Sequence, residues 1–141
     1  MNNPSGTTPL IVVSSPQGFE AACSALEAAI PAHGFGLLAV HDLADTLRRK
    51  GIAFAEQCRI YEICQPQQAA RVLAADLSLN MALPCRLSVY TEAGATKIGM
   101  ISPVAMLAGL SNDPELQSVA AEVEATTRAI IVTAAAAGEP A

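Results

Sequence analysis

Apolar and polar positions follow a short period in some segments of the chain and a longer period in others. Runs rich in apolar and β-branched residues predict strands, and these runs are residues 9–15, 35–40, 58–63, 85–91 and 96–102. The apolar run at residues 35–40 predicts a buried strand. The last two runs flank the short glycine-containing link EAGA, so they predict an antiparallel hairpin.

Apolar residues recur at helical spacing directly after the first predicted strand. Residues 16–30 open with a proline, which is a helix-start signal, and they end before Pro31. The buried stripe of this helix consists of Phe19, Cys23, Leu26 and Ile30. We therefore expect the first helix to pack on the sheet through this stripe.

A short second helix is predicted over residues 43–50. Asp42 is a suitable N-cap for it, because an aspartate side chain accepts hydrogen bonds from free backbone N–H groups. Leu43 and Leu47 lie on one side of this helix, and Gly51 stops it.

The remaining helices begin at a cap residue followed by proline. Gln65 and Pro66 begin a helix over residues 66–77, and its apolar edge consists of Ala70, Leu73 and Leu77. Pro103 opens a helical turn, and Asp113 caps the last helix. The core-facing residues of the last helix are Leu116, Val119, Val123 and Ile130.

Strands and helices mix without strict alternation, and the clearest strand pair is a hairpin. This order favours an α+β domain, with a mostly antiparallel sheet backed by helices, over a doubly wound parallel sheet. The chain contains no internal repeat and no domain-sized linker. We therefore predict a single α+β domain over residues 9–137, a flexible leader at 1–8 and a frayed tail at 138–141.

Composition narrows the functional classes. With 141 residues, 52% hydrophobic and 15% charged, the chain can bury a core without disulfides or metal, and its apolar surplus points to a homodimer interface. A net charge of -5 argues against nucleic acid or an anionic membrane as a partner. The apolar segment at 119–138 is interrupted by Glu122, Glu124 and Arg128, so it predicts no membrane span. The start of the chain shows no signal-peptide pattern, and we expect a cytoplasmic protein.

The four cysteines are expected to be thiols in a reducing compartment. Cys64 comes just before a predicted helix start, where the helix dipole favours a thiolate. Cys85 follows Pro84 at a strand entrance, and the two thiols meet if their strands are neighbours. The alternative is that both are small apolar residues of the core, as expected for Cys23 on the stripe of the first helix. Cys58 shares a strand face with Cys64 but lies ~20 Å away, too far to share one ion.

Other candidate groups are sparse. Glu62 lies inside a predicted strand, so it needs Arg59, Arg71 or Arg86 as a partner or a raised pKa, unless it faces outward at an edge. His33 and His41 are interpreted as solvated residues at the ends of elements. No paired zinc-ligand spacing, glycine-rich phosphate loop or nucleophile elbow is present in the sequence. We therefore predict no catalytic residue, and the cofactor is unknown.

Three short motifs, in this order, resemble the bacterial and archaeal family called domain of unknown function 302. They are Cys64-Gln65-Pro66, Leu83-Pro84-Cys85 and Ser102-Pro103, and the resemblance extends over residues 10–133. The family is typified by Cys-Asn-Pro at a helix start, Leu-Pro-Cys at a strand start and Asp-Pro before a short helix. Gln65 replaces the usual Asn, and Glu62 stands where a small residue is usual, so its carboxylate works against a Cys64 thiolate.

The resemblance implies a curved antiparallel sheet with helices on one side, in a TATA-binding-protein-like arrangement, and a homodimer. It implies no established activity. The saddle-like shape is not evidence of DNA binding, because fold does not determine function and the chain is acidic.

Three hypotheses follow for function. In the first, Cys64 and Cys85, with Glu62, Pro66 and Pro84 nearby, form a site for a small ligand or for a soft metal such as Cu(I). In the second, a thiol redox or sulfur-transfer enzyme uses Cys64 as nucleophile and Cys85 as resolving thiol. In the third, the chain is a dimeric interaction module with inert thiols. No base, metal set or cofactor loop accompanies the thiols, so binding or interaction ranks above an enzyme.

Overall fold

The computed structural model describes residues 9–138 and contains a five-stranded antiparallel sheet that is backed by helices. The strands are β1 (Leu10–Ser15), β2 (Gly36–Asp42), β3 (Cys58–Cys64), β4 (Cys85–Glu92) and β5 (Ala95–Ile101). Their order in the sheet is β1-β5-β4-β3-β2, and every neighbouring pair is antiparallel. The predicted α+β class and the β4–β5 hairpin are therefore confirmed. The predicted leader at 1–8, and the predicted tail apart from Gly138, lie outside the described residues.

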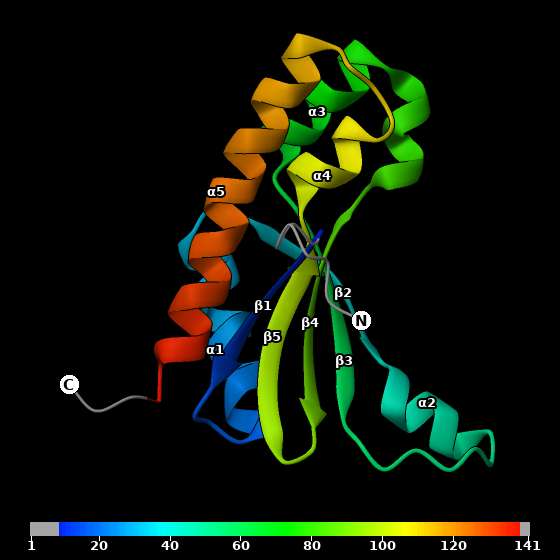
Figure 1. Ribbon diagram of the computed structural model, residues 1–141, viewed down its shortest axis with the longest axis vertical. Coiled ribbons are helices and arrows are strands. Elements are labelled where there is room, and N and C mark those ends of the chain that lie inside the picture. Colours follow the sequence, from blue (N-terminus) through cyan, green and yellow to red (C-terminus); the bar gives the residue numbers. More distant parts are fainter. Residues whose placement is uncertain (1–8, 139–141) are drawn as a thin grey trace, which may run out of the picture.

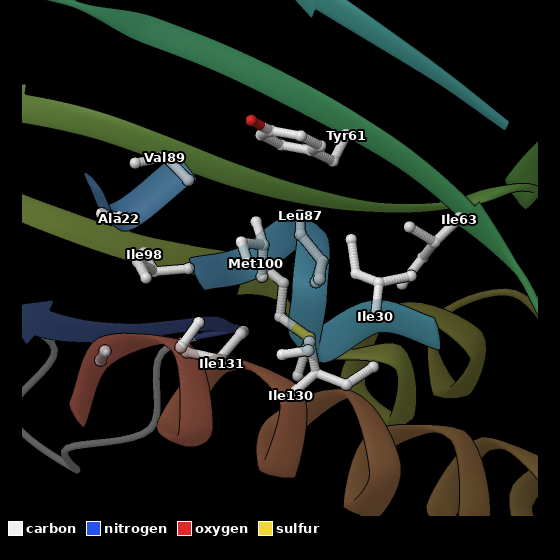
Figure 2. Packing of buried hydrophobic residues seen from close by; sticks show 14 of the residues in the cluster. Ala22, Ile30, Tyr61, Ile63, Leu87, Val89, Ile98, Met100, Ile130 and Ile131 are labelled. Atoms are coloured by element: carbon white, nitrogen blue, oxygen red, sulfur yellow. The ribbon is translucent and has the colours of Figure 1, made fainter. Parts of the chain in front are cut away.

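Helices α1 (Phe19–Ala32) and α5 (Pro114–Ala136) pack on one face of this sheet, as Figure 1 shows. Between them and the strands lies the larger hydrophobic cluster, which we call the sheet core. In Figure 2, Leu87, Ile98 and Met100 of the sheet point toward Ile130 and Ile131 of α5. Burial of these side chains is the main force that holds the helices on the sheet.

A second hydrophobic cluster, the helical core, lies beyond one end of the sheet. It is built by α3 (Pro66–Ala75), the 3₁₀-helix η1 (Leu77–Ala82), α4 (Pro103–Ala108) and the N-terminal part of α5. Its buried residues are Val72, Leu79, Leu107, Leu116, Val119 and Ala120. Figure 1 shows α5 running along both parts, so this one helix connects the two cores.

The other face of the sheet carries no packed helix in the described part of the chain. The apolar residues Leu10, Val12, Ile60, Tyr90 and Ile101 line a shallow groove of about 290 Å³ on it. Leu10 and Ile101 are more than half exposed, at 55% and 53%. We call this surface the open face.

The expectation of a buried strand at residues 35–40 is wrong. β2 is an edge strand that pairs with β3 alone, and Leu37, Leu38 and Val40 are exposed. An irregularity between Leu37 and Ala39 interrupts the pairing. Apolar content identified the strand correctly, but the position of a strand in the sheet decides its burial.

Two helix predictions also need correction. α1 begins at Phe19 rather than at Pro16, because Ser15 accepts a hydrogen bond from the Gln17 backbone and holds this segment as a turn. α1 also continues through Pro31. In α3 the buried residue is Val72, whereas the expected edge residues Ala70 and Leu77 are exposed.

The other cap predictions are confirmed. Asp42 accepts a hydrogen bond from the backbone of Asp45 at the start of α2 (Leu43–Arg49), although Ala44 is buried there instead of Leu43. Asp113 caps α5, and the four predicted core-facing residues of α5 are all buried. Within residues 9–138, no helix is both long and apolar enough to cross a membrane.

Candidate functional site

Cys64 is the last residue of β3, and the chain turns there into α3. The Gln65 side chain accepts a hydrogen bond from the Gln68 backbone N–H at 2.7 Å, and Pro66 occupies the first turn. This confirms the predicted cap, because the side chain satisfies an N–H group that the helix itself leaves free.

Cys85 is the first residue of β4 and follows Pro84, whose peptide bond to Leu83 is cis. Strands β3 and β4 are neighbours, and Ile63 is the register partner of Cys85. The two cysteine segments therefore meet, as expected if their strands pair. Both cysteines are free thiols.

Cys64 and Cys85 line one cavity of about 250 Å³. Its walls are apolar and come from both cores: Phe35, Ile63 and Val123 belong to the sheet core, whereas Val72 and Leu83 pack in the helical core. The cavity therefore lies at the junction of the two cores, where the strand ends meet the helices.

No charged side chain of the described residues lines this cavity. Burial raises the pKa of the Cys85 thiol to about 11, and the negative charge of a Cys64 thiolate adds to the shift. Cys85 is therefore a neutral thiol at physiological pH.

Gln68 is a polar residue of the cavity that sequence reasoning missed. Its amide oxygen, Oε1, is buried and accepts no hydrogen bond from any residue in the described range 9–138. The spacing Gln65-x-x-Gln68 is similar to a capping box, in which the second side chain bonds back to the cap. That pattern would have pointed to capping rather than to a ligand site.

The cavity includes some of the predicted site residues and leaves out others. Pro84 lines it together with the two cysteines. Pro66 is exposed at the start of α3 and does not line the cavity. Glu62 does not line it either; its carboxylate lies 3.4 Å from the imidazole of His41.

Glu62 pairs with none of the three arginines that we named as possible partners for a carboxylate inside the sheet. Arg59 binds Glu20 and Asp42 instead, and Arg71 binds Glu115 and Glu122. Arg86 is the register partner of Glu62 on β4, but no ion pair joins the two residues. His41, interpreted as a solvated strand end, is the residue that contacts Glu62.

The other two cysteines lie away from the cavity. Cys23 is buried in the sheet core as predicted, and burial raises the pKa of its thiol. Cys58 lies at the opposite end of β3 from Cys64. Among residues 9–138 no group of three or more His, Cys, Asp or Glu side chains could hold a metal ion, so a metal at the cavity would have Cys64 and Cys85 as its thiol ligands.

A five-stranded antiparallel sheet, helices on one face and two thiols at a strand–helix junction define a small α+β domain of the kind that the sequence motifs indicated. The family model described as "Domain of unknown function DUF302" matches residues 11–134. The chain belongs to this family. A search of curated proteins finds no match.

A solved structure supports the same assignment. It is described as an uncharacterized conserved protein DUF302 from Bacillus stearothermophilus, and it is 38% identical to this chain with a TM-score of 0.85. The match covers 91% of this chain and 99% of the other. The earlier resemblance, drawn from the cysteine and proline motifs, is thereby confirmed.

Proposed function

We propose that this protein binds a small, uncharged molecule in the cavity that Cys64 and Cys85 line. The supporting observation is an apolar cavity of about 250 Å³ that two cysteines and Gln68 line, and the amide oxygen of Gln68 is buried without a donor in the described residues. Ligand sites are typically apolar hollows with a few placed polar groups. A dry cavity of roughly 150 Å³ accommodates benzene, so this one suits a molecule of one or two rings.

A soft metal such as Cu(I) is the less favoured occupant of the same cavity. Thiolates of Cys64 and Cys85 would be its ligands. Metal binding needs deprotonated thiols, however, and the pKa of Cys85 is raised to about 11. The apolar walls and the neutral thiol favour an uncharged ligand over an ion.

A thiol redox or sulfur-transfer reaction is the second candidate. Its support is that Cys64 and Cys85 line the same cavity from the ends of adjacent strands. In this role Cys64 is the nucleophile and Cys85 the resolving thiol. The raised pKa of Cys85 weakens this candidate, because a thiol attacks as its thiolate.

A titration with benzofuran, a neutral two-ring probe, tests the binding proposal. Ala69 lines the cavity, whereas the neighbouring Ala70 is exposed on the same helix. Ala69→Leu places extra atoms in the cavity and should weaken benzofuran binding at least tenfold. Ala70→Leu adds the same atoms at the surface and should leave binding unchanged. Equal binding by both variants and the wild type, or no binding by the wild type, would contradict the proposal.

We also propose that two copies of the chain associate through the open face. Val12, Ile60 and Ile101 give it an apolar centre. Glu62 and Arg86, which are register partners, supply both signs of charge on one patch. A two-fold interface places the same patch against itself, so a patch with both signs is self-complementary.

A further inference from the structure

Oε1 of Gln68 is a buried hydrogen-bond acceptor without a donor among residues 9–138. Buried polar groups in folded proteins nearly always have a partner, so an exception needs a physical explanation. Gln68 lines the cavity together with Cys64 and Cys85. The residue with the unsatisfied acceptor therefore lines the cavity that we propose as the ligand site.

Gln68 lies between the cavity and the outer surface. It lines the cavity and also borders an outer depression that Arg71 and Glu122 line. Arg71 and Glu122 are joined by an ion pair, in which Nη1 of Arg71 donates to the carboxylate at 2.8 Å. Oε1 of Gln68 accepts no hydrogen bond from that pair.

The surroundings offer poor alternatives to a ligand as donor. A buried water molecule needs two to four polar partners, whereas the cavity walls are mainly apolar. The amide of Gln65, which also lines the cavity, already bonds the Gln67 side chain and the Gln68 backbone. The thiols of Cys64 and Cys85 are weak donors. A group that enters the cavity with an N–H or O–H would satisfy the acceptor.

We propose that Gln68 determines the class of ligand: a neutral, mainly apolar molecule of one or two rings that donates one N–H or O–H to Oε1. This inference rests on the proposed function of the cavity. It adds a selection rule, because a molecule of the same shape without a donor leaves Oε1 unpartnered and binds more weakly.

Indole and benzofuran form the matched pair of probes that tests this rule, because they share size and shape and differ in one N–H donor. We expect the wild type to bind indole about fivefold more tightly in calorimetry. Gln68→Met, which removes the acceptor at similar side-chain length, should reduce the ratio to one or below. Gln67→Met, on the exposed neighbour in the same helix, should leave the ratio unchanged.

The outcomes separate this inference from the proposal on which it rests. If the wild type binds both probes equally and Ala69→Leu weakens both, the cavity is a binding site and the role of Gln68 is wrong. A preference for indole that persists in Gln68→Met also overturns that role. If neither probe binds the wild type, both the proposed function and this inference fail.

Discussion

Cys64 and Cys85 reach one cavity although the alternation of their strands would separate them. Cys64 shares strand parity with Ile60 and Glu62, whereas Cys85 shares parity with the buried Leu87. Both cysteines are terminal residues of their strands, where the backbone leaves the sheet for α3 or enters it from η1. Side-chain direction at such positions is set by the connection and not by the pleat.

The partly buried thiol of Cys85 should make the free energy of unfolding fall at alkaline pH. Because its pKa is raised from 9.0 to about 11, the folded state holds this proton more tightly than the unfolded state does. The stabilisation is complete below about pH 9 and is lost as the pH rises through about 11. Over this range the free energy of unfolding of the wild type should fall by roughly 2 kcal/mol more than that of Cys85→Ser.

Urea unfolding of the two proteins at intervals between pH 8 and 11 measures this difference. Other groups that titrate in the range are common to both proteins, so they cancel in the comparison. Parallel pH curves for the wild type and Cys85→Ser would show that folding does not raise the pKa of the Cys85 thiol.

The role of a side chain was predictable where it depended on residues close by in the sequence. Asp42 and Gln65 cap helices as expected because each bonds a backbone N–H three residues away. The partner of Glu62 and the orphan oxygen of Gln68 were not predictable. His41 contacts Glu62 only because β2 pairs with β3, and Gln68 is enclosed only because α3 folds over the strand ends.

At the scale of elements, β1 approaches β5 closely at Gly99. Val12 is the register partner of Gly99, and a Cβ atom added there would lie 2.8 Å from the carbonyl oxygen of Ile11 and 3.1 Å from Cγ2 of Val12. The backbone oxygen cannot move aside without disturbing the strand pairing. Glycine at this position therefore allows the edge strand to join the sheet.

Gly99→Ala should destabilise the protein by about 1–3 kcal/mol, because the added methyl forces β1 away from β5. Gly36→Ala is the matched control, since its Cβ would meet only the Cys64 carbonyl oxygen at an ordinary 3.7 Å. We expect the control to change stability by less than about 0.5 kcal/mol. Thermal unfolding measures both, and equal melting temperatures would contradict the close approach at Gly99.

Most elements were predictable from sequence because turns, caps and periodicity are local. The EAGA link predicted the β4–β5 hairpin, and Pro103 and Asp113 predicted the starts of α4 and α5. The burial of β2 and the inward side of α3 were predicted wrongly. Both depend on which elements lie alongside them in the fold, and apolar spacing in one segment does not contain that information.

At the scale of the whole molecule, the chain forms two hydrophobic cores, and α5 packs in both. The cavity lies where these cores meet.

The sequence indicated the α+β class and the pairing of β4 with β5, but the order β1-β5-β4-β3-β2 and the second core arise from long-range packing. The cavity is a product of that packing, so the motifs indicated its cysteines but not its walls. A single domain over residues 9–137 stays a prediction.

The proposed dimer predicts that a charge on the open face dissociates the protein. Ile101 lines the open face and is 53% exposed, whereas Leu110 lies after α4 and is 57% exposed. Ile101→Glu should give a monomer in size-exclusion chromatography with light scattering, because the interface would bury one added carboxylate from each copy. Leu110→Glu should remain a dimer. A wild type that is monomeric at micromolar concentration would contradict the proposed interface.

The most direct test of the central claim is to map benzofuran on the isotopically labelled wild type by NMR. This measurement separates the cavity from the groove on the open face, which is also apolar and has a similar volume of about 290 Å³. We predict that the backbone amide signals of Cys64, Gln68, Val72 and Cys85 shift on titration, while those of Val12 and Ile101 stay in place. Shifts confined to Val12, Ile101 and their neighbours, or no shifts at all, would contradict the claim that the cavity between the two cores is the binding site.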